Sequence, residues 1–327
     1  MRRREFMALI GAAAMVRPGD ARAQAPGRRP LIAWLSGGAP KMSASFVDNF
    51  LRGMRELGYV EGRDFDMIYR YTEGQQERLP ALTEEVIGLR PDVILAPAVI
   101  GAVAARKVTS TIPIVSPALA DAVHLGLIAN EARPGGNVTG IEPYVAGLPA
   151  KQLEFAREVA SGVSRIGLLT NLNDPKAPPQ ARELEALART LEIKTVSVDV
   201  NLPAEIDGAL QQLASERVDV AIVLQTSLLL GQAERIAATA LAKRLPTVYG
   251  YREHVLAGGL ISYGVDLRWC YYRGASFVDK ILRGTPPGDL PVEFPTKMVL
   301  AVNLKTAKAL GLDISPTLIT RADEVIE

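Results

Sequence analysis

Cysteine and histidine are scarce in this sequence, whose 327 residues include one cysteine and two histidines. The single cysteine, Cys270, excludes an internal disulfide and a CxxC redox pair. The histidines, His124 and His254, are too few for a histidine-based metal site and are not adjacent to Cys270 in the sequence. We therefore expect no metal and no cofactor.

The sequence also lacks a strong excess of charge and a hydrophobic run long enough to cross a membrane. Its formal net charge is +1, and the first 25 residues carry five arginines but only two acidic residues. Without that segment the net charge is −2, so no surface for nucleic acid is expected. The composition, 48% hydrophobic and 22% charged, is that of a globular protein long enough for about two domains.

Signatures of catalysis are missing as well. No GxGxxG follows a predicted strand, and the sequence has no P-loop, no GxSxG and no HExxH. Three aspartates near predicted strand ends, Asp121, Asp174 and Asp266, leave an acid–base pair open, although a cap or turn role is favoured for each. The sequence therefore predicts a protein that is not an enzyme, and a secreted α/β enzyme is kept as the less favoured alternative.

Residues 1–25 have the organisation of an export signal. Three arginines, Arg2 to Arg4, precede an apolar run from Phe6 to Val16, and Ala23-Gln24-Ala25 fits a small-x-small cleavage site. The segment around Arg3-Arg4 also resembles the twin-arginine signal. We expect a soluble periplasmic protein that touches the membrane only through a partner. The alternative is an amphipathic N-terminal helix.

Buried-strand and amphipathic-helix patterns alternate along the rest of the chain, in two series. Two βαβαβαβ series predict an α/β fold of two doubly wound, Rossmann-like lobes joined by a hinge, each with a parallel sheet. The predicted strands are 31–35, 65–71, 93–96 and 112–115 in the first series, and 165–170, 194–200, 218–224 and 245–249 in the second.

The segment between the two series is predicted to begin with a helix. Apolar residues from Leu119 to Ile128 follow a helical period, and the helix is expected to end near Arg133-Pro134. A turn at Gly135-Gly136 would then carry the chain across to the second lobe, with the ligand beside it. Polar residues at two helix starts, Ser43 and Asn303, are predicted N-caps.

Three passages between the lobes, near residues 140, 264 and 294, give the predicted domain organisation. The N-terminal lobe comprises 30–140 plus 264–293, and the C-terminal lobe comprises 141–263 plus 294–327.

The candidate ligand-binding residues follow predicted strands, because ligands of open parallel sheets bind at the carboxyl ends of the strands. They are small, hydroxylic, amide or aromatic residues without concentrated charge, and helices after the first and third strands would direct N–H groups at a carboxylate. The candidates are Ser36, Gly37, Gly38, Pro97, Ala98 and Ser116 in the first series, Tyr144 after the crossing, and Asn171, Gln225, Thr226, Tyr249 and Tyr251 in the second.

Several sequence words resemble a known family, the substrate-binding proteins of ABC transporters that include tryptophan- and tyrosine-type binding components. The words are GLI at 126–128, RPGGNVTG at 133–140, VDKIL at 278–282, DLPVE at 289–293 and VNLKTAKALGL at 302–312. The resemblance extends from about Pro30 to the end of the chain. It implies a type I periplasmic-binding-protein fold, ligand capture between lobes and delivery to an ABC permease.

The leading hypothesis is a monomeric, periplasmic solute-binding protein of an ABC importer. Its ligand is expected to be a small carboxylate, an aromatic amino acid or a related acid, because the candidate residues offer hydroxyls, amides and rings but no arginine clamp. The ligand-sensing module of a receptor or regulator is the alternative, since it shares the fold class.

Overall fold

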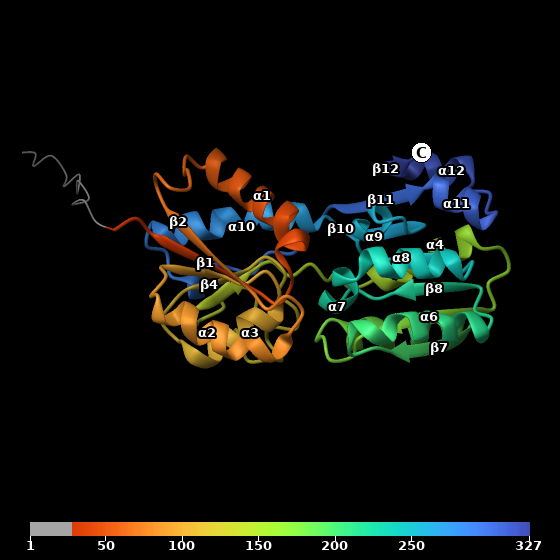
Figure 1. Ribbon diagram of the computed structural model, residues 1–327, viewed down its shortest axis with the longest axis horizontal. Coiled ribbons are helices and arrows are strands. Elements are labelled where there is room, and N and C mark those ends of the chain that lie inside the picture. Colours follow the sequence, from red (N-terminus) through yellow and green to blue (C-terminus); the bar gives the residue numbers. More distant parts are fainter. Residues whose placement is uncertain (1–27) are drawn as a thin grey trace, which may run out of the picture.

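The computed structural model describes residues 28–327, so the predicted export signal lies outside the described residues. Two α/β lobes lie side by side along the long axis of the molecule (Figure 1). Each lobe contains a sheet that is parallel throughout or nearly so, with helices on both faces. The predicted fold class, two doubly wound lobes, is therefore confirmed.

The sheet of the first lobe has five parallel strands in the order β2-β1-β3-β4-β5. The side chains of its first strand alternate between the two faces of the sheet, since Trp34 packs on one face and Leu35 on the other. All side chains of the three-residue strands are buried, as expected of strands covered on both faces. The strands are β1 (Leu31–Ser36), β2 (Asp66–Tyr71), β3 (Val93–Leu95), β4 (Ile114–Ser116) and β5 (Val138–Gly140).

Two pairs of helices cover this sheet: α1 (Pro40–Glu56) and α10 (Leu267–Leu282) on one face, α2 (Leu79–Gly88) and α3 (Val99–Val108) on the other. Helices α1 and α10 approach closely because α1 has a glycine at the contact. A Cβ on Gly53 would lie 2.4 Å from the carbonyl oxygen of Tyr272.

The sheet of the second lobe has seven strands in the order β12-β11-β10-β9-β8-β6-β7. Only the pairing of β10 with β11 is antiparallel. The strands are β6 (Arg165–Thr170), β7 (Lys194–Asp199), β8 (Val220–Val223), β9 (Thr247–Tyr249), β10 (Ile261–Val265), β11 (Met298–Asn303) and β12 (Glu324–Ile326).

The helices of the second lobe include two differences from the sequence prediction. The sequence pattern over 228–244 indicates one helix, which the structure divides at Gln232 into two, and the tail forms a helix and an edge strand, β12, that were not predicted. The helices are α4 (Leu148–Val159), α5 (Ala177–Thr190), α6 (Ile206–Ser215), α7 (Ser227–Gly231), α8 (Ala233–Ala242), α9 (Arg252–Leu256), α11 (Leu304–Leu310) and α12 (Pro316–Arg321), and short 3₁₀ turns are η1 (Gln76–Arg78), η2 (Pro203–Glu205) and η3 (Pro287–Asp289).

The predicted caps have mixed outcomes. Asn303 caps α11, since its Oδ1 accepts from the N–H of Thr306 at 3.0 Å, and Asp266 caps α10 through the N–H of Arg268, also at 3.0 Å. The predicted cap at Ser43 is wrong. Helix α1 begins three residues earlier at Pro40, a residue preorganised for the first helical position, so Ser43 lies buried inside the helix.

The predicted helix from Leu119 to Arg133 is also wrong, because this segment is a series of turns. Asp121 and Gly126 have left-handed φ values of 48° and 66°, which interrupt a right-handed helix. The apolar residues that imitate a helical period are buried nevertheless: Leu119 and Leu127 fill the core beside α3.

The Gly135-Gly136 turn does not carry the chain between the lobes. Gly135 has a φ of 73°, and its N–H donates to the carbonyl oxygen of Gly288 at 3.0 Å within the first lobe. The turn precedes β5, so it lies at the amino end of that strand, opposite the carboxyl edge where a ligand is expected. The passage instead follows Gly140, so the prediction that this turn is the crossing between the lobes is wrong.

The chain passes between the two sheets three times: from β5 to α4, from β10 to α10, and from η3 to β11. The first and third passages run side by side. The N–H of Glu142 donates to the carbonyl oxygen of Glu293 at 2.9 Å, and the N–H of Glu293 donates to that of Gly140 at 3.0 Å.

Candidate ligand site between the lobes

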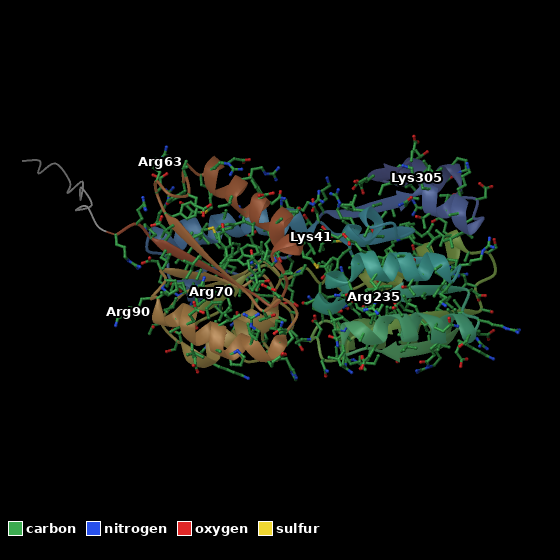
Figure 2. All side chains as sticks on the ribbon, in the orientation of Figure 1. Lys41, Arg63, Arg70, Arg90, Arg235 and Lys305 are labelled. Carbon is green, nitrogen blue, oxygen red and sulfur yellow. The ribbon has the colours of Figure 1, made fainter. Side chains whose placement is uncertain are left out.

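The carboxyl edges of the two sheets face the boundary between the lobes. The chain leaves the first sheet at the carboxyl end of β5 and the second at the carboxyl end of β10, and each time it enters the other lobe. Lys41 lies where the lobes meet (Figure 2), with its Nζ 3.3 Å from Oε1 of Glu234 in the second lobe. The candidate residues at the strand ends are therefore set around this boundary.

The loop after β1 contains three of the predicted residues and is tightly folded. The Oγ of Ser36 accepts from the N–H of Gly38 at 3.0 Å. The carbonyl oxygen of Gly37 accepts from Oγ1 of Thr72 at 2.8 Å, and a Cβ on Gly37 would lie 2.8 Å from Cδ1 of Ile100. A larger residue at position 37 would therefore require the end of the Ile100 side chain on α3 to shift.

The loops after β3 and β4 contribute Pro97, Ala98 and Ser116. The carbonyl oxygen of Pro97 accepts from the hydroxyl of Tyr271 at 2.6 Å, which ties this loop to α10, and Ala98 begins α3. Ser116 is fully buried, and its Oγ has no hydrogen-bond partner. An unpaired hydroxyl at a carboxyl edge is a group that a ligand could satisfy.

In the second lobe the predicted amide and hydroxyl residues hold the edge together. Nδ2 of Asn171 donates to the carbonyl oxygen of Val200 at 2.8 Å, and Nε2 of Gln225 donates to that of Gly250 at 2.9 Å. Thr226 caps α7. These side chains are buried and already paired, so their contacts position the loops after β6, β8 and β9.

The three predicted tyrosines have different surroundings. Tyr249 is fully buried in the core, stacks on His254 with ring centroids 4.7 Å apart, and accepts from Thr247 at 2.8 Å. Thr247 lies at the amino end of β9, so the Tyr249 hydroxyl that it binds points away from the carboxyl edge. We therefore do not include Tyr249 among the proposed ligand contacts. Tyr144 donates to Glu183 at 3.0 Å.

Tyr251 lies at the boundary itself. It belongs to the second lobe, but it packs into the hydrophobic cluster of the first lobe that contains Trp34, Phe46 and Tyr271. Phe46 and Tyr271 stack with centroids 4.4 Å apart, and Trp34 and Tyr271 with centroids 5.8 Å apart. Burial, and then the charge of Asp174, raise the pKa of the Tyr251 hydroxyl far above its usual value. An aromatic cluster therefore bridges the two lobes.

Charged residues also gather at this edge, contrary to the expectation of none. Asp174 and Lys176 follow β6, and both side chains are 4% exposed. The carboxylate of Asp174 accepts from the N–H groups of Lys176 at 3.1 Å and Ser227 at 2.7 Å. The Lys176 ammonium, by contrast, lies 3.7 Å from Oδ2 of Asp174, too far for a hydrogen bond.

Glu142, on the first passage between the lobes, is electrostatically close to this pair. Its Oε1 accepts from the N–H of Asp121 at 3.0 Å. Burial raises the pKa of its carboxyl group, while that hydrogen bond and the charge of Lys176 lower it. This group of charges could not be predicted from the sequence, because Lys176 and Glu142 are distant along the chain and only the fold brings them together.

A second charged pair, Glu253 and Arg268, follows β9 and β10. Oε1 of Glu253 lies 4.0 Å from Nε of Arg268. Both carboxylate oxygens and that Nε are buried and have no hydrogen-bond partner. Burial raises the pKa of the Glu253 carboxyl, while the contact with its own backbone N–H and the charges of Arg268 and Arg252 lower it.

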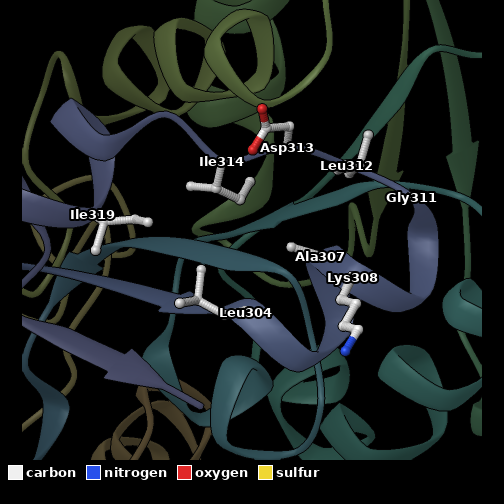
Figure 3. Close-up of a pocket in the computed structure, with 8 residues that line it drawn as sticks. All are labelled: Leu304, Ala307, Lys308, Gly311, Leu312, Asp313, Ile314 and Ile319. Carbon is white, nitrogen blue, oxygen red and sulfur yellow. The ribbon is translucent and has the colours of Figure 1, made fainter.

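A cavity of about 410 Å³ lies elsewhere, beside α11 and α12 at the end of the second lobe remote from the first (Figures 1 and 3). Leu304, Leu312 and Ile314 line it, and Lys308 and Asp313 flank it. Strand β11, which is antiparallel to β10, ends beside this cavity, so the cavity lies at the end of the sheet opposite the carboxyl ends of β6, β8, β9 and β10.

Within residues 28–327, no group of three or more histidine, cysteine, aspartate or glutamate side chains is placed to hold a metal ion. In the same range, no helix is both long and apolar enough to cross a bilayer.

Known proteins identify the family of the chain. Residues 39–326 match the family described as ABC transporter substrate binding protein. This chain belongs to that family. The resemblance inferred from the sequence words is therefore confirmed, and so is the type of function: a substrate-binding protein of an ABC transporter, in a family of solute-binding proteins that deliver small molecules to permease subunits.

Relatives of this substrate-binding protein are known in sequence and structure. A tyrosine-binding protein of Clostridioides difficile (strain R20291) is 24% identical over 263 residues, which cover 80% of this chain and 75% of the relative. The ABC domain from Streptococcus pneumoniae in complex with L-Trp has a TM-score of 0.85 at 21% identity. A conserved domain protein from Vibrio cholerae has the same TM-score at 26% identity. Both structures are covered completely and cover 91% of this chain, which confirms the type I periplasmic-binding-protein fold.

Proposed function

We propose that this substrate-binding protein captures a small carboxylate-bearing ligand, an aromatic amino acid or a related acid, between its two lobes for an ABC importer. The names of two similar proteins support the ligand class: one is a tyrosine-binding protein and another was solved with L-Trp. The aromatic cluster that bridges the lobes offers a surface for the ring of such a ligand.

The observation that carries the proposal is the Lys176 ammonium. It is buried at the carboxyl edge, it makes no hydrogen bond to Asp174, and both oxygens of Asp174 already accept from backbone N–H groups. The charge of Asp174 lies nearby, but the donors of the buried ammonium still need acceptors, and a ligand carboxylate would supply them. The prediction of a carboxylate ligand from the sequence did not depend on Lys176.

The remaining ligand contacts are proposed from the strand ends. The unpaired hydroxyl of Ser116 would bind a polar atom of the ligand, and the ring of Tyr251 would contact its apolar body. Asn171, Gln225 and Thr226 would act by fixing the loops that carry Lys176 and Tyr251. The other proposed contacts come from Ser36, Gly37, Gly38, Pro97, Ala98 and Tyr144.

A screen of purified protein by thermal shift and intrinsic fluorescence would test the ligand class. Amino acids, aromatic acids, sugars and purines are compared. A ligand at a hundred times its Kd stabilises the protein by about 2.7 kcal/mol. Trp34 should report binding, because it lies in the aromatic cluster. A sugar that stabilises the protein while no carboxylate does would contradict the proposed ligand.

The proposal includes a cellular location and a working cycle. The protein would be exported to the periplasm by the segment 1–25, act as a monomer and close on its ligand before it meets the permease. A reporter fused to residues 1–30 should reach the periplasm, and Arg3→Lys with Arg4→Lys should reduce export if the twin-arginine route is used. Retention of the unmodified fusion in the cytoplasm would contradict the location.

A further inference from the structure

Glu253 is an exception among the described acidic residues whose carboxylate oxygens are buried. Both its carboxylate oxygens are buried, and neither accepts a hydrogen bond from another residue in the described part of the chain. Asp174 and Asp279 are also buried, but Asp174 accepts from two backbone N–H groups, and Asp279 accepts from Tyr59 at 3.0 Å and Arg283 at 2.7 Å. A buried carboxylate without donors is costly, and such an exception calls for a partner.

Arg268 does not serve as that partner. Its Nε lies 4.0 Å from Oε1 of Glu253, beyond hydrogen-bond length, and is itself buried without a partner. Arg252, the other nearby cation, is bound elsewhere, since its Nη2 lies 2.6 Å from Oε2 of Glu324. Both guanidinium groups are close enough to favour the ionised form of Glu253 without satisfying its oxygens.

The Glu253 carboxylate faces the boundary between the lobes. Glu253 is the second residue of α9, four residues after the carboxyl end of β9, and follows Tyr251 by two residues. Its negative charge contributes to the raised pKa values of the Tyr251 and Tyr271 hydroxyls and of the Cys270 thiol, after burial. Tyr271 and Cys270 belong to the first lobe's cluster, so the carboxylate lies beside the aromatic residues that bridge the lobes.

We propose that Glu253 accepts hydrogen bonds from the protonated amine of the ligand, which makes the preferred ligand a free amino acid rather than its deaminated acid. An ammonium group has three donors and no acceptor, so it can satisfy both unpaired oxygens. The neighbouring tyrosine rings suit a cation as well. This inference rests on the proposed function. Lys176 would hold the carboxylate of the same zwitterion, and Glu253 would hold its amine.

The test is a calorimetric comparison of matched ligands: L-tyrosine against 3-(4-hydroxyphenyl)propionate, and L-tryptophan against indole-3-propionate. Each pair differs only in the amine. The wild-type protein should bind the amino acid about 10- to 100-fold more tightly, the range of a buried charge-assisted hydrogen bond. In Glu253→Gln this preference should fall below about 3-fold, because only the amino acid loses affinity. Glu234→Gln, at an 80% exposed side chain, is the control and should retain the preference.

Stability separates this role from a structural one. Without ligand, Glu253→Gln should melt at nearly the temperature of the wild type, because the variant keeps the shape of the side chain and breaks no hydrogen bond to another residue. Equal affinity of the wild-type protein for both members of a pair, which needs no variant, would overturn the inference and leave the proposed function standing. Equal loss of both ligands in a folded Glu253→Gln would also overturn it. Failure of all four compounds to bind would overturn the proposed function as well.

Discussion

The two walls of the boundary between the lobes differ in chemistry. The loops after β1, β3 and β4 in the first lobe begin with Gly37, Ala96 and Pro117, and they offer a ligand backbone groups and apolar side chains next to the aromatic cluster. The loops after β6, β9 and β10 in the second lobe carry two opposite charge pairs, Asp174 with Lys176 and Glu253 with Arg268.

This difference suggests a division of labour across the boundary. The first wall is apolar and aromatic, so it suits the body of a ligand, whereas the second wall suits the charged groups of a zwitterion. Binding to the charged wall alone would leave the ring exposed, and binding to the aromatic wall alone would leave the charges unpaired. The ligand therefore has reason to join both walls.

The largest expected effect is a loss of stability at acidic pH that originates in the second lobe. His254, in the second lobe, is buried against Tyr249, and burial lowers its pKa to about 4 from about 6.5. The unfolded chain binds a proton between these values and the folded protein does not, so stability should fall by about 3 kcal/mol as the pH drops from 6.5 to 4.

Chemical denaturation at several pH values would measure this loss. Hydrogen exchange should show it in the second lobe first. In His254→Leu the loss should shrink, whereas His124→Gln, at an exposed histidine, should behave as the wild type. A steeper acid loss in the first lobe would contradict the assignment.

The second-largest effect is expected when the Lys176 ammonium is removed from the charged wall. Lys176→Met should weaken carboxylate ligands by about 2–3 kcal/mol, because a buried charge-assisted contact is lost. Lys41→Met removes a cation of the same kind at a side chain that is 85% exposed, so it is the matched control. Calorimetry would measure both variants. Unchanged affinity in Lys176→Met would place the ligand carboxylate elsewhere.

A smaller effect is expected at the aromatic wall. Ser116→Ala should weaken the ligand by about 1 kcal/mol, the value of one neutral hydrogen bond. The variant should leave the unliganded protein as stable as the wild type, because the hydroxyl has no partner there. Thr139→Ala, which removes a buried hydrogen bond to the carbonyl oxygen of Leu290, should instead lower stability and spare affinity. The reverse pattern, measured by calorimetry and denaturation, would contradict the assignment.

The smallest effect concerns the contact across the outer rim. The Lys41–Glu234 pair has side chains that are 85% and 80% exposed, so Lys41→Met should change affinity by less than about 0.5 kcal/mol. A titration at low and at high salt would show whether this pair contributes to closure. A large, salt-sensitive loss would mean that the rim, rather than the walls, holds the lobes together.

Local chemistry explains what the sequence could predict. Buried strands such as 165–170 and 31–36 are continuous apolar runs between helical patterns, so both series of elements and the parallel sheets were predicted. The helix from Leu119 was predicted wrongly because buried turns place apolar residues at spacings that imitate a helical period. The φ values of Asp121 and Gly126 that distinguish the two come from packing.

The site was harder to predict than the fold. Strand ends indicated where polar groups would collect, but nothing local distinguishes Gln225, which is bound to Gly250, from a residue free to bind ligand. The residues around Lys176 are ordinary turn residues, and those around Glu253 are typical of the start of a helix. Their burial, and the absence of donors near Glu253, arise only when distant loops meet.

The paired passages at Gly140–Glu142 and Glu293 act as a pivot. Two backbone hydrogen bonds join them, and Arg273 of α10 binds both carboxylate oxygens of Glu293 at 2.7 Å. Segments fixed to each other in this way can twist together but cannot slide apart. We therefore expect the proposed closure of the lobes to be a rotation about this line, in which atoms far from it, such as those of Lys41 and Glu234, move through the longest arc.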